Sequence, residues 1–336
     1  MKAIVYGTYG PPDVLHTEEI EKPVPGENEV LVKVHATSVN FGDLLARRVR
    51  YVSSRDFHMP SLFLMMARLD FGLRKPKRQI LGSEFSGEIE ATGKAVTIFQ
   101  KGDPVFGYLG QKMGAYAEYL CMPENGVLAK KPVKISHEEA ATIPMGAVMA
   151  IYLLREKGNL KPGKKVLVNG ASGSIGSAAV QLLKHYFETE VTGVCSTRRI
   201  AYVKSLGADK VIDYTREDFT EQSESYDLIF DVLGKSSFAQ CKKVLKPNGR
   251  YLLASFKLKQ LLQMMGTRIT GGPSGKKVIC AFAPGSVKDL HAVRELIDAG
   301  KFKTVLDRTF PMEQAAEAHR YVEEGQKKAS VAIRFT

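Results

Sequence analysis

Tryptophan is absent from this sequence of 336 residues, cysteine is scarce, and long apolar runs are missing. The four cysteines, Cys121, Cys195, Cys241 and Cys280, are far apart and form no CxxC pair. Their number and spacing argue against a disulfide framework or a zinc knuckle, and they fit a reducing compartment. No apolar run approaches the ~20 residues that span a bilayer. The N-terminus begins directly with a strand pattern and shows no signal peptide, so we expect a cytoplasmic protein.

The composition is that of a soluble globular protein with an excess of positive charge. Hydrophobic residues make up 44%, charged residues 25%, and the formal net charge is +12. Such a charge fits nucleic acid, an anionic membrane or a phosphorylated ligand as partner, or only a solvated surface. No aromatic-rich RNA-binding signature accompanies it, so we expect no nucleic-acid partner.

One glycine-rich turn organises the sequence. A short apolar run, Val166–Val168, predicts a buried strand, and Gly170, Gly173 and Gly176 follow at spacings of three before a helical pattern. Strand, glycine turn and helix form the context in which a backbone approaches the pyrophosphate of a dinucleotide. The loop residues Ser172, Ser174 and Ile175 are therefore candidate cofactor contacts. The alternative is an ordinary glycine-rich turn, because the spacing is GxxGxxG rather than GxGxxG.

The patterns on either side of this turn differ. Before it, alternating stretches such as Lys2–Tyr6 and Glu29–Ala36, punctuated by glycine and proline, predict a mostly antiparallel β domain. After it, strands alternate with helices, which is typical of a doubly wound parallel sheet. The strands are predicted at Val166–Asn169, Glu190–Cys195, Lys210–Asp213, Leu228–Val232, Gly249–Ser255 and Val278–Ala283. The helices are predicted at Ser177–Tyr186, Arg199–Leu206, Phe238–Leu245 and Val287–Ala299, with a last strand at Val331–Phe335.

Several motifs together resemble the medium-chain dehydrogenase/reductase family, in particular its zinc-free quinone oxidoreductase branch. They are the Ser-Val-Asn-x-x-Asp loop at 38–43, Gly-x-Glu at 82–84, Gly-Asp-x-Val-Phe-Gly at 102–107, Tyr-Ala-Glu-Tyr at 116–119 and the glycine turn. The resemblance implies an α/β fold in which a Rossmann domain is inserted into a GroES-like β domain. Residues 1–124 plus 300–336 would form the GroES-like domain, and 125–299 the Rossmann domain. It also implies a homodimer.

The resemblance implies no metal. Zinc-dependent members place a cysteine where Asn40 stands, a histidine where Ser83 stands and a second cysteine near Met145. None of these three residues is a good zinc ligand, and the cysteine-rich structural zinc lobe is missing.

The cofactor expected from these residues is NADP(H). The stretch Gly193–Arg199 after the second strand of the parallel sheet carries no carboxylate for a ribose 2′-hydroxyl. It offers Ser196, Arg198 and Arg199, which suit a 2′-phosphate, although arginines at a helix start can be merely exposed. The resemblance adds Tyr214 over that phosphate, and it places Leu233, Gly234, Ser255 and Phe282 beside the nicotinamide.

The catalytic residues expected are Asn40 and Asp43. Without zinc, hydrogen-bond donors must stabilise the developing oxyanion, and the Asn40 amide can donate. Asp43 would orient the loop or contact the cofactor. The alternative for both is a capping or turn role. We expect Glu84 to be a structural carboxylate buried between the domains, and Tyr51 is a conceivable proton donor.

Residues 47–79 look like an insertion that is rich in arginine, lysine and methionine. Three readings stay open: a flexible lid over an apolar cleft, an amphipathic helix on an anionic membrane, or a surface helix packed on its own domain. Met65 and Met66, together with the apolar and basic stretch 257–265, would then wall the cleft.

The leading functional interpretation is an NADPH-dependent, zinc-independent reductase of quinones or α,β-unsaturated carbonyls. A reductase of simple aldehydes or ketones is the second interpretation. A non-catalytic NADPH-binding regulator or nucleic-acid-binding protein is the third.

Overall fold

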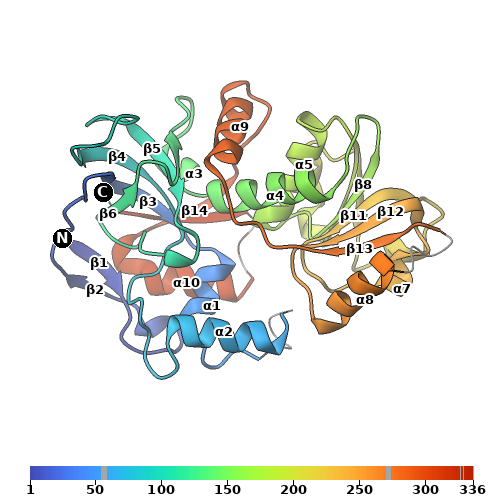
Figure 1. The fold of residues 1–336 in the computed structure, drawn as a ribbon, viewed down its shortest axis with the longest axis horizontal. Helices are drawn as coiled ribbons and strands as arrows, with labels where there is room; N and C mark the ends of the chain where they lie inside the picture. Colours follow the sequence, from blue (N-terminus) through green and yellow to red (C-terminus); the bar gives the residue numbers. More distant parts are fainter. Residues whose placement is uncertain (54–58, 270–273, 326, 328, 336) are drawn as a thin grey trace.

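Two β-sheets lie side by side in the protein, each covered by helices, as Figure 1 shows. The computed structural model describes residues 1–53, 59–269, 274–325, 327 and 329–335. One sheet has six parallel strands, and the other has seven strands, most of them antiparallel. The predicted α/β fold, a Rossmann domain combined with a GroES-like β domain, is confirmed.

The seven-stranded sheet belongs to the GroES-like part of the chain. Its order is β14-β15-β3-β4-β5-β7, with β6 pairing to β3. The strands are β3 (Glu29–Ser38), β4 (Glu84–Thr92), β5 (Pro104–Tyr108), β6 (Tyr119–Pro123), β7 (Val127–Lys130), β14 (Leu306–Pro311) and β15 (Ser330–Arg334). The C-terminal strand β15 pairs with β3, so the chain leaves this sheet, forms the parallel sheet and returns. β7 pairs with β5 beyond residue 124, so the sheet extends past that expected boundary.

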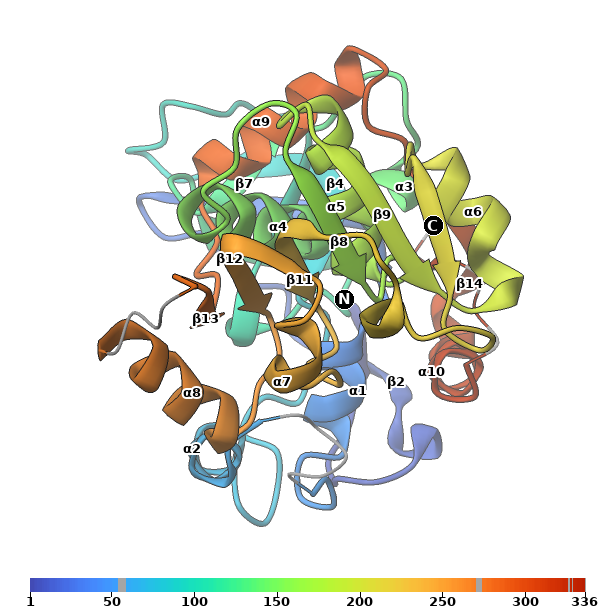
Figure 2. The same ribbon diagram turned by 90° about the vertical axis from the view of Figure 1, so that its right-hand side faces the viewer.

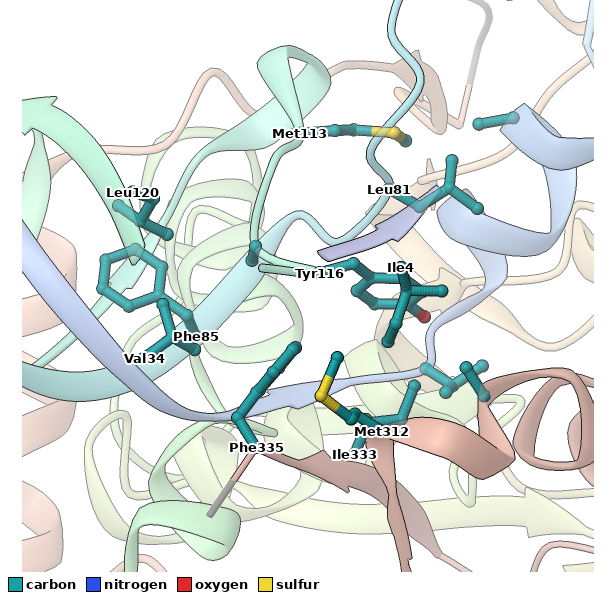
Figure 3. Close-up of a cluster of buried hydrophobic side chains, with 14 of the residues drawn as sticks. Ile4, Val34, Leu81, Phe85, Met113, Tyr116, Leu120, Met312, Ile333 and Phe335 are labelled. Carbon is teal, nitrogen blue, oxygen red and sulfur yellow. The ribbon is translucent and has the colours of Figure 1, made fainter. Parts of the chain in front are cut away.

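A compact apolar core fills the space between this sheet and its N-terminal segment. A small antiparallel sheet, β1 (Lys2–Val5) with β2 (His16–Glu19), contributes Ile4 to this core. Figure 3 shows Ile4, Phe85, Tyr116 and Ile333 converging from four separate parts of the chain. Because side chains alternate between the two faces of a strand, apolar residues at alternate positions of these strands point into this core.

The parallel sheet has the order β10-β9-β8-β11-β12-β13. This is the 3-2-1-4-5-6 order of a Rossmann fold, with the reversal between β8 and β11. The strands are β8 (Lys165–Asn169), β9 (Glu190–Cys195), β10 (Lys210–Asp213), β11 (Tyr226–Asp231), β12 (Leu245–Leu253) and β13 (Lys277–Cys280). Their near-continuous runs of buried Val, Leu and Ile fit a sheet that is covered on both faces.

Ten α-helices and five short 3₁₀ helices complete the described residues. The α-helices are α1 (Phe41–Arg47), α2 (Ser61–Phe71), α3 (His137–Ala140), α4 (Pro144–Lys157), α5 (Ser174–His185), α6 (Ile200–Ser205), α7 (Phe238–Cys241), α8 (Leu258–Ile269), α9 (Val287–Asp298) and α10 (Ala315–Glu323). The 3₁₀ helices are η1 (Pro12–Val14), η2 (Gly110–Lys112), η3 (Thr197–Arg199), η4 (Phe219–Glu221) and η5 (Met312–Gln314). Within the described residues, each helix is too short or too polar to cross a lipid bilayer.

Three predicted boundaries need correction. The helix predicted at Phe238–Leu245 ends at Cys241, because the Val244 carbonyl accepts from the Tyr226 N–H and Leu245 enters β12. The strand predicted from Gly249 therefore begins four residues earlier, at Leu245. The strand predicted to reach Ala283 ends at Cys280.

The inserted segment contributes helix α2, which lies beside α8 of the parallel-sheet part, as both Figure 1 and Figure 2 show. Leu64 and Phe71 of α2 are buried in the core of the antiparallel-sheet part. Phe63 contacts the ring of Phe282 at 5.7 Å between centroids, from the other domain. α2 thus packs on its own domain and also reaches across to the second. Residues 54–58 of the insertion lie outside the described residues.

Candidate cofactor and active site

The glycine turn has the geometry that a phosphate-binding loop requires. Gly170 ends β8 with a φ of +89°, which glycine adopts without strain. A Cβ on Gly176 would lie 2.1 Å from the Gly170 carbonyl oxygen, so only glycine lets helix α5 start this close to the strand. By contrast, a Cβ on Gly173 would meet nothing nearer than the Gly170 carbonyl oxygen, at 3.6 Å. Space is therefore left beside Gly173.

The start of helix α5 offers donors to that space. Gly173 occupies the N-cap position without a side-chain hydrogen bond. Among the residues that the structure describes, no acceptor is recorded for the N–H groups of Ser174, Ile175 and Gly176. Unpaired N–H groups and the helix dipole attract an anion at this position. Residues 170–176 thus fit the pyrophosphate of a dinucleotide.

A cavity of about 490 Å³ lies between the two sheets and reaches the glycine turn. Residues of both domains line it. The parallel-sheet part contributes Gly173, Ser174 and Ile175 from the turn, and Leu233 and Ser255 from beyond the ends of β11 and β12. Across it stand Ser38, Asn40, Phe41 and Glu84 of the antiparallel-sheet part. Its size and its position at the carboxyl ends of parallel strands are those of a ligand site.

The loop after β11 is held by Asp231, a residue that sequence reasoning missed. This carboxylate is fully buried and accepts from the N–H groups of Leu233 and Gly234, at 3.2 and 2.9 Å. A Cβ on Gly234, which has a φ of +65°, would lie 2.1 Å from the Ser255 carbonyl oxygen. The loop is therefore pinned against the end of β12. An Asp at a strand end followed by a glycine three residues later was the available signal.

The residues predicted to bind the ribose 2′-phosphate of the cofactor lie together just after strands β9 and β10. Arg198 is exposed, Ser196 is half-buried, and Tyr214 is 62% exposed. A carboxylate is present nearby, Asp213, but its oxygens accept from Thr197 Oγ1 at 2.5 Å and from Thr215 Oγ1 at 2.7 Å. These hydrogen bonds lower the pKa of Asp213, led by the one from Thr197. The Asp213 carboxylate is thus already hydrogen-bonded to the two threonine hydroxyls of the protein itself.

Arg199 has a different environment from Arg198. Its guanidinium donates to the backbone carbonyl of Lys327, which belongs to the segment leading into β15. Arg199 therefore joins the Rossmann part to the returning C-terminal segment, and Arg198 is the arginine directed to solvent.

Asn40 and Asp43 form the N-terminal cap of helix α1. The Asn40 side-chain oxygen accepts from the N–H groups of Gly42 and Asp43, and Asp43 Oδ2 accepts from the Asn40 N–H at 3.0 Å. Asp43 Oδ1 accepts from the Gly82 N–H at 3.0 Å, and the residue is fully buried. Burial raises the pKa of Asp43 to about 7, against the two backbone hydrogen bonds. Both side chains thus have the capping role that was the alternative interpretation of the sequence. Asn40 also borders the cavity.

Glu84 is a buried carboxyl at the cavity wall, as expected. Ser38 Oγ donates to one of its oxygens, and the Met145 N–H donates to the other at 2.8 Å. Met145 belongs to α4, so Glu84 connects the two domains. Burial raises the pKa of Glu84 to about 7, and the hydrogen bonds and the charge of Lys327 oppose this shift.

Lys327 is the second residue that the sequence did not reveal. It is half-buried and borders the cavity together with Glu84. Burial lowers the pKa of the Lys327 ammonium, Arg199 lowers it further, and Glu84 and Asp307 raise it. Within the described residues, no ion pair is recorded for this ammonium. In the sequence it is one lysine among many, and only the return of the chain to the first sheet brings it here.

The positions that hold zinc ligands in related metal enzymes converge in this protein. Asn40 Nδ2 donates to Ser83 Oγ at 2.8 Å, next to the bond between Met145 and Glu84. An amide and a hydroxyl replace the thiolate and imidazole ligands that Zn²⁺ prefers, so the donor set does not fit zinc. Elsewhere in the described residues, no group of three or more His, Cys, Asp or Glu side chains is placed to hold a metal.

Other residues predicted for the site lie outside the cavity. Tyr51 is 65% exposed, and Met65 and Met66 are 51% and 56% exposed. Phe282 is 54% exposed, and its ring lies tilted against the ring of Phe256, with 4.9 Å between centroids. These side chains are not part of the cavity wall.

Comparison with known proteins agrees with this geometry. Residues 26–133 match the alcohol dehydrogenase GroES-like domain, and residues 206–333 match a domain described as zinc-binding dehydrogenase. The chain is 32% identical to the mitochondrial NAD(P)H oxidoreductase RTN4IP1 of Homo sapiens, over 99% of this chain and 89% of that protein. It is 30% identical to 2-methylene-furan-3-one reductase of Solanum lycopersicum, over 99% of this chain and 79% of that protein.

Among solved structures, the quinone oxidoreductase from Coxiella burnetii superposes with a TM-score of 0.82 at 27% identity, covering 100% of this chain and 99% of that one. Its fold and those relatives agree with the nicotinamide-cofactor site built above. The chain therefore belongs to the medium-chain dehydrogenase/reductase superfamily, in its quinone oxidoreductase-like branch, and is an oxidoreductase that uses a nicotinamide cofactor.

Proposed function

We propose that this protein is an NADPH-dependent, zinc-independent reductase of quinones or α,β-unsaturated carbonyls. The observation that carries the proposal is the cavity itself. It joins a helix start with unpaired N–H groups to a wall that carries a lysine ammonium and a buried carboxyl. Two proteins named above, 2-methylene-furan-3-one reductase and the quinone oxidoreductase from Coxiella burnetii, support this class of acceptor.

The residues present fit a dinucleotide along one path. The N–H groups of Ser174 and Ile175 would hold the pyrophosphate, and Arg198, Ser196 and Tyr214 would hold a 2′-phosphate. Leu233 and Ser255 would border the nicotinamide. When bound, the reduced cofactor supplies a hydride to the acceptor.

The chain's own contribution is electrostatic. Reduction of a quinone or enone leaves negative charge on the acceptor oxygen, which a positioned positive charge stabilises. Two lysines border the cavity, Lys235 and Lys327. We assign this role to Lys327, which is half-buried, whereas Lys235 is exposed. Glu84, at the same wall, raises the pKa of the Lys327 ammonium and so favours its charged form. Ser38 and Asn40 keep the Glu84 carboxyl in place.

The decisive experiment is an assay of NADPH oxidation with a quinone and an enone, with product analysis. We expect saturation of the carbon–carbon double bond or formation of the hydroquinone, with activity that survives a chelator. Formation of an alcohol with the double bond intact would favour the second interpretation, a carbonyl reductase. Absence of turnover with a broad acceptor panel would contradict the proposal.

The state of assembly and the compartment belong to the same proposal. We propose a homodimer from the family resemblance, which sedimentation analysis tests, with a monomer as the contradicting result. The four cysteines of this chain are free and buried or half-buried, which fits a reducing compartment such as the cytoplasm. Localisation of the tagged full chain tests that assignment, and recovery from an oxidising compartment would contradict it.

A further inference from the structure

An apolar face with a basic border lies on helices α2 and α8. On α2, Leu62, Met65, Met66 and Leu69 are exposed by 48% to 59%, at the spacing of one helical stripe. On α8, Leu258, Leu262 and Met265 are exposed by 56% to 60%, again as one stripe. We call these seven residues the apolar rim.

The two halves of the rim lie on neighbouring helices. Phe63 of α2 and Leu261 and Met264 of α8 pack against the same core cluster. Figure 2 shows the two helices next to each other, and in Figure 1 both lie along the lower edge of the molecule. The inner sides of both helices are therefore fixed by packing, while their outer sides turn seven large apolar side chains to solvent. An exposed patch of this kind marks an interaction site.

The charged residues on these two helices and just after α2 are basic, with one exception. Exposed basic residues adjoin both helices: Arg74, Lys75 and Lys77 after α2, and Lys259 and Arg268 on α8. Between 59 and 79 the only acidic residue is Asp70, which pairs with Arg78 at 2.8 Å. Between 257 and 269 there is none. An apolar stripe bordered by lysine and arginine is the composition of helices that lie in an anionic membrane interface.

We propose that the apolar rim docks on an anionic lipid bilayer, with α2 and α8 lying at the interface. A second copy of the chain is a poorer occupant, because a two-fold interface sets the same surface against itself and would oppose its basic borders. Docking here would bring the lipid close to the contact between Phe63 and Phe282, where the two domains touch. The surface argument stands on its own, and its link to apolar acceptors that partition into lipid rests on the proposed function.

The test is flotation of the full chain with vesicles of phosphatidylcholine alone or mixed with phosphatidylglycerol, without cofactor or acceptor. We expect recovery with the anionic vesicles only, falling as salt is raised. The double substitution Met66→Ser and Leu262→Ser should lower the bound fraction about tenfold or more. Lys75→Glu with Lys259→Glu should lower it similarly. The matched control is Ile98→Ser with Val133→Ser, which changes residues exposed by 57% and 89% in the loop between β4 and β5 and the loop between β7 and α3.

Three results would overturn the proposal. They are no recovery with any vesicle, equal loss in the control variant, or a concentration-dependent dimer that the Met66→Ser and Leu262→Ser variant abolishes. NADPH oxidation with a water-soluble enone, measured on the same variants, separates this outcome from failure of the proposed reaction. We expect that activity to be unchanged, because the rim lies outside the cavity.

Discussion

At the scale of single residues, two side chains carry the assignments that most need testing. Arg198 stands exposed at the end of β9, where a ribose 2′-phosphate would lie, while its neighbour Arg199 is bound to the Lys327 carbonyl. Lys327 supplies positive charge to the cavity wall. Neighbours in the sequence thus differ in role, because one faces solvent and the other faces the returning chain.

Substitution of Arg198→Ala is expected to reduce the preference for NADPH over NADH. A charge-assisted contact to a phosphate contributes about 1.5–3 kcal/mol, so the affinity for NADPH should fall roughly 10- to 100-fold. The affinity for NADH should change little. Nucleotide titration followed by fluorescence measures both. Lys204→Ala, on the exposed side of α6, removes a nearby charge as control, and an equal effect there would refute the assignment.

Substitution of Lys327→Met is expected to lower kcat by on the order of 100-fold, the scale found when an oxyanion-stabilising group is removed. The Michaelis constant for NADPH should change less than kcat, because the ammonium is assigned to the acceptor. Steady-state kinetics with NADPH and an enone separate the two parameters. Lys301→Met, at an exposed position, is the control. A rise in the NADPH constant at unchanged kcat would instead assign Lys327 to the cofactor.

At the scale of elements, the strand, glycine turn and helix at 165–185 act as one unit. Gly176 permits close packing of α5 on β8, and Gly173 leaves room for a ligand. We therefore expect glycine to be required for packing at position 176 and for ligand binding at position 173. Substitutions at the two positions should have different effects.

Gly173→Val should leave the fold intact, because φ is −78° and a Cβ there meets no atom closer than 3.6 Å. It should weaken NADPH binding at least about tenfold, because the side chain would occupy the phosphate position. Gly176→Val should instead destabilise the fold by about 3 kcal/mol or more through overpacking. Urea unfolding and nucleotide titration on both variants provide the comparison. Unchanged affinity in Gly173→Val would contradict a phosphate at this helix start.

Most elements of the parallel sheet could be predicted from the sequence, since β-branched runs alternate with amphipathic helices. Helix α4 was missed because it is apolar on nearly every side and shows no amphipathic period. The helical form of α8 was also missed, although its apolar and basic character was recognised. Propensity could not show that Val244 and Leu245 leave a helical pattern to pair with β11.

The candidate site was predictable where it consists of short motifs, as at the glycine turn. It was not predictable where distant segments meet. Lys327 reaches Glu84 only because β15 returns to β3, across more than 200 residues of sequence. The sequence could not decide between a capping and a catalytic role for Asn40 and Asp43, because Asn and Asp occur in both helix caps and active sites.

At the scale of the whole molecule, two buried carboxyls, Glu84 at the contact between the domains and Asp43 in the antiparallel-sheet part, should make stability depend on pH. Burial raises the pKa of both Glu84 and Asp43 to about 7, so the folded state binds protons that the unfolded state has released. Their contribution to stability is therefore complete at low pH and is lost as the pH rises from about 4 to about 7.

Glu84→Gln removes one of these two groups. The slope of unfolding free energy against pH in that window should become less negative, by up to about 1.4 kcal/mol per pH unit for one proton. Urea unfolding at a series of pH values measures the slope. Glu313→Gln, at an exposed site, is the matched change of charge. An identical slope in wild type and Glu84→Gln would show that the carboxyl is ionised in the folded protein.

The most direct test of the central claim is nucleotide titration of the purified, chelator-treated protein, with its metal content determined on the same sample. The account predicts one NADPH bound per chain, weaker binding of NADH, and no stoichiometric zinc. A protein that holds one zinc per chain at the Asn40 and Ser83 position, or that binds neither nucleotide, would contradict it.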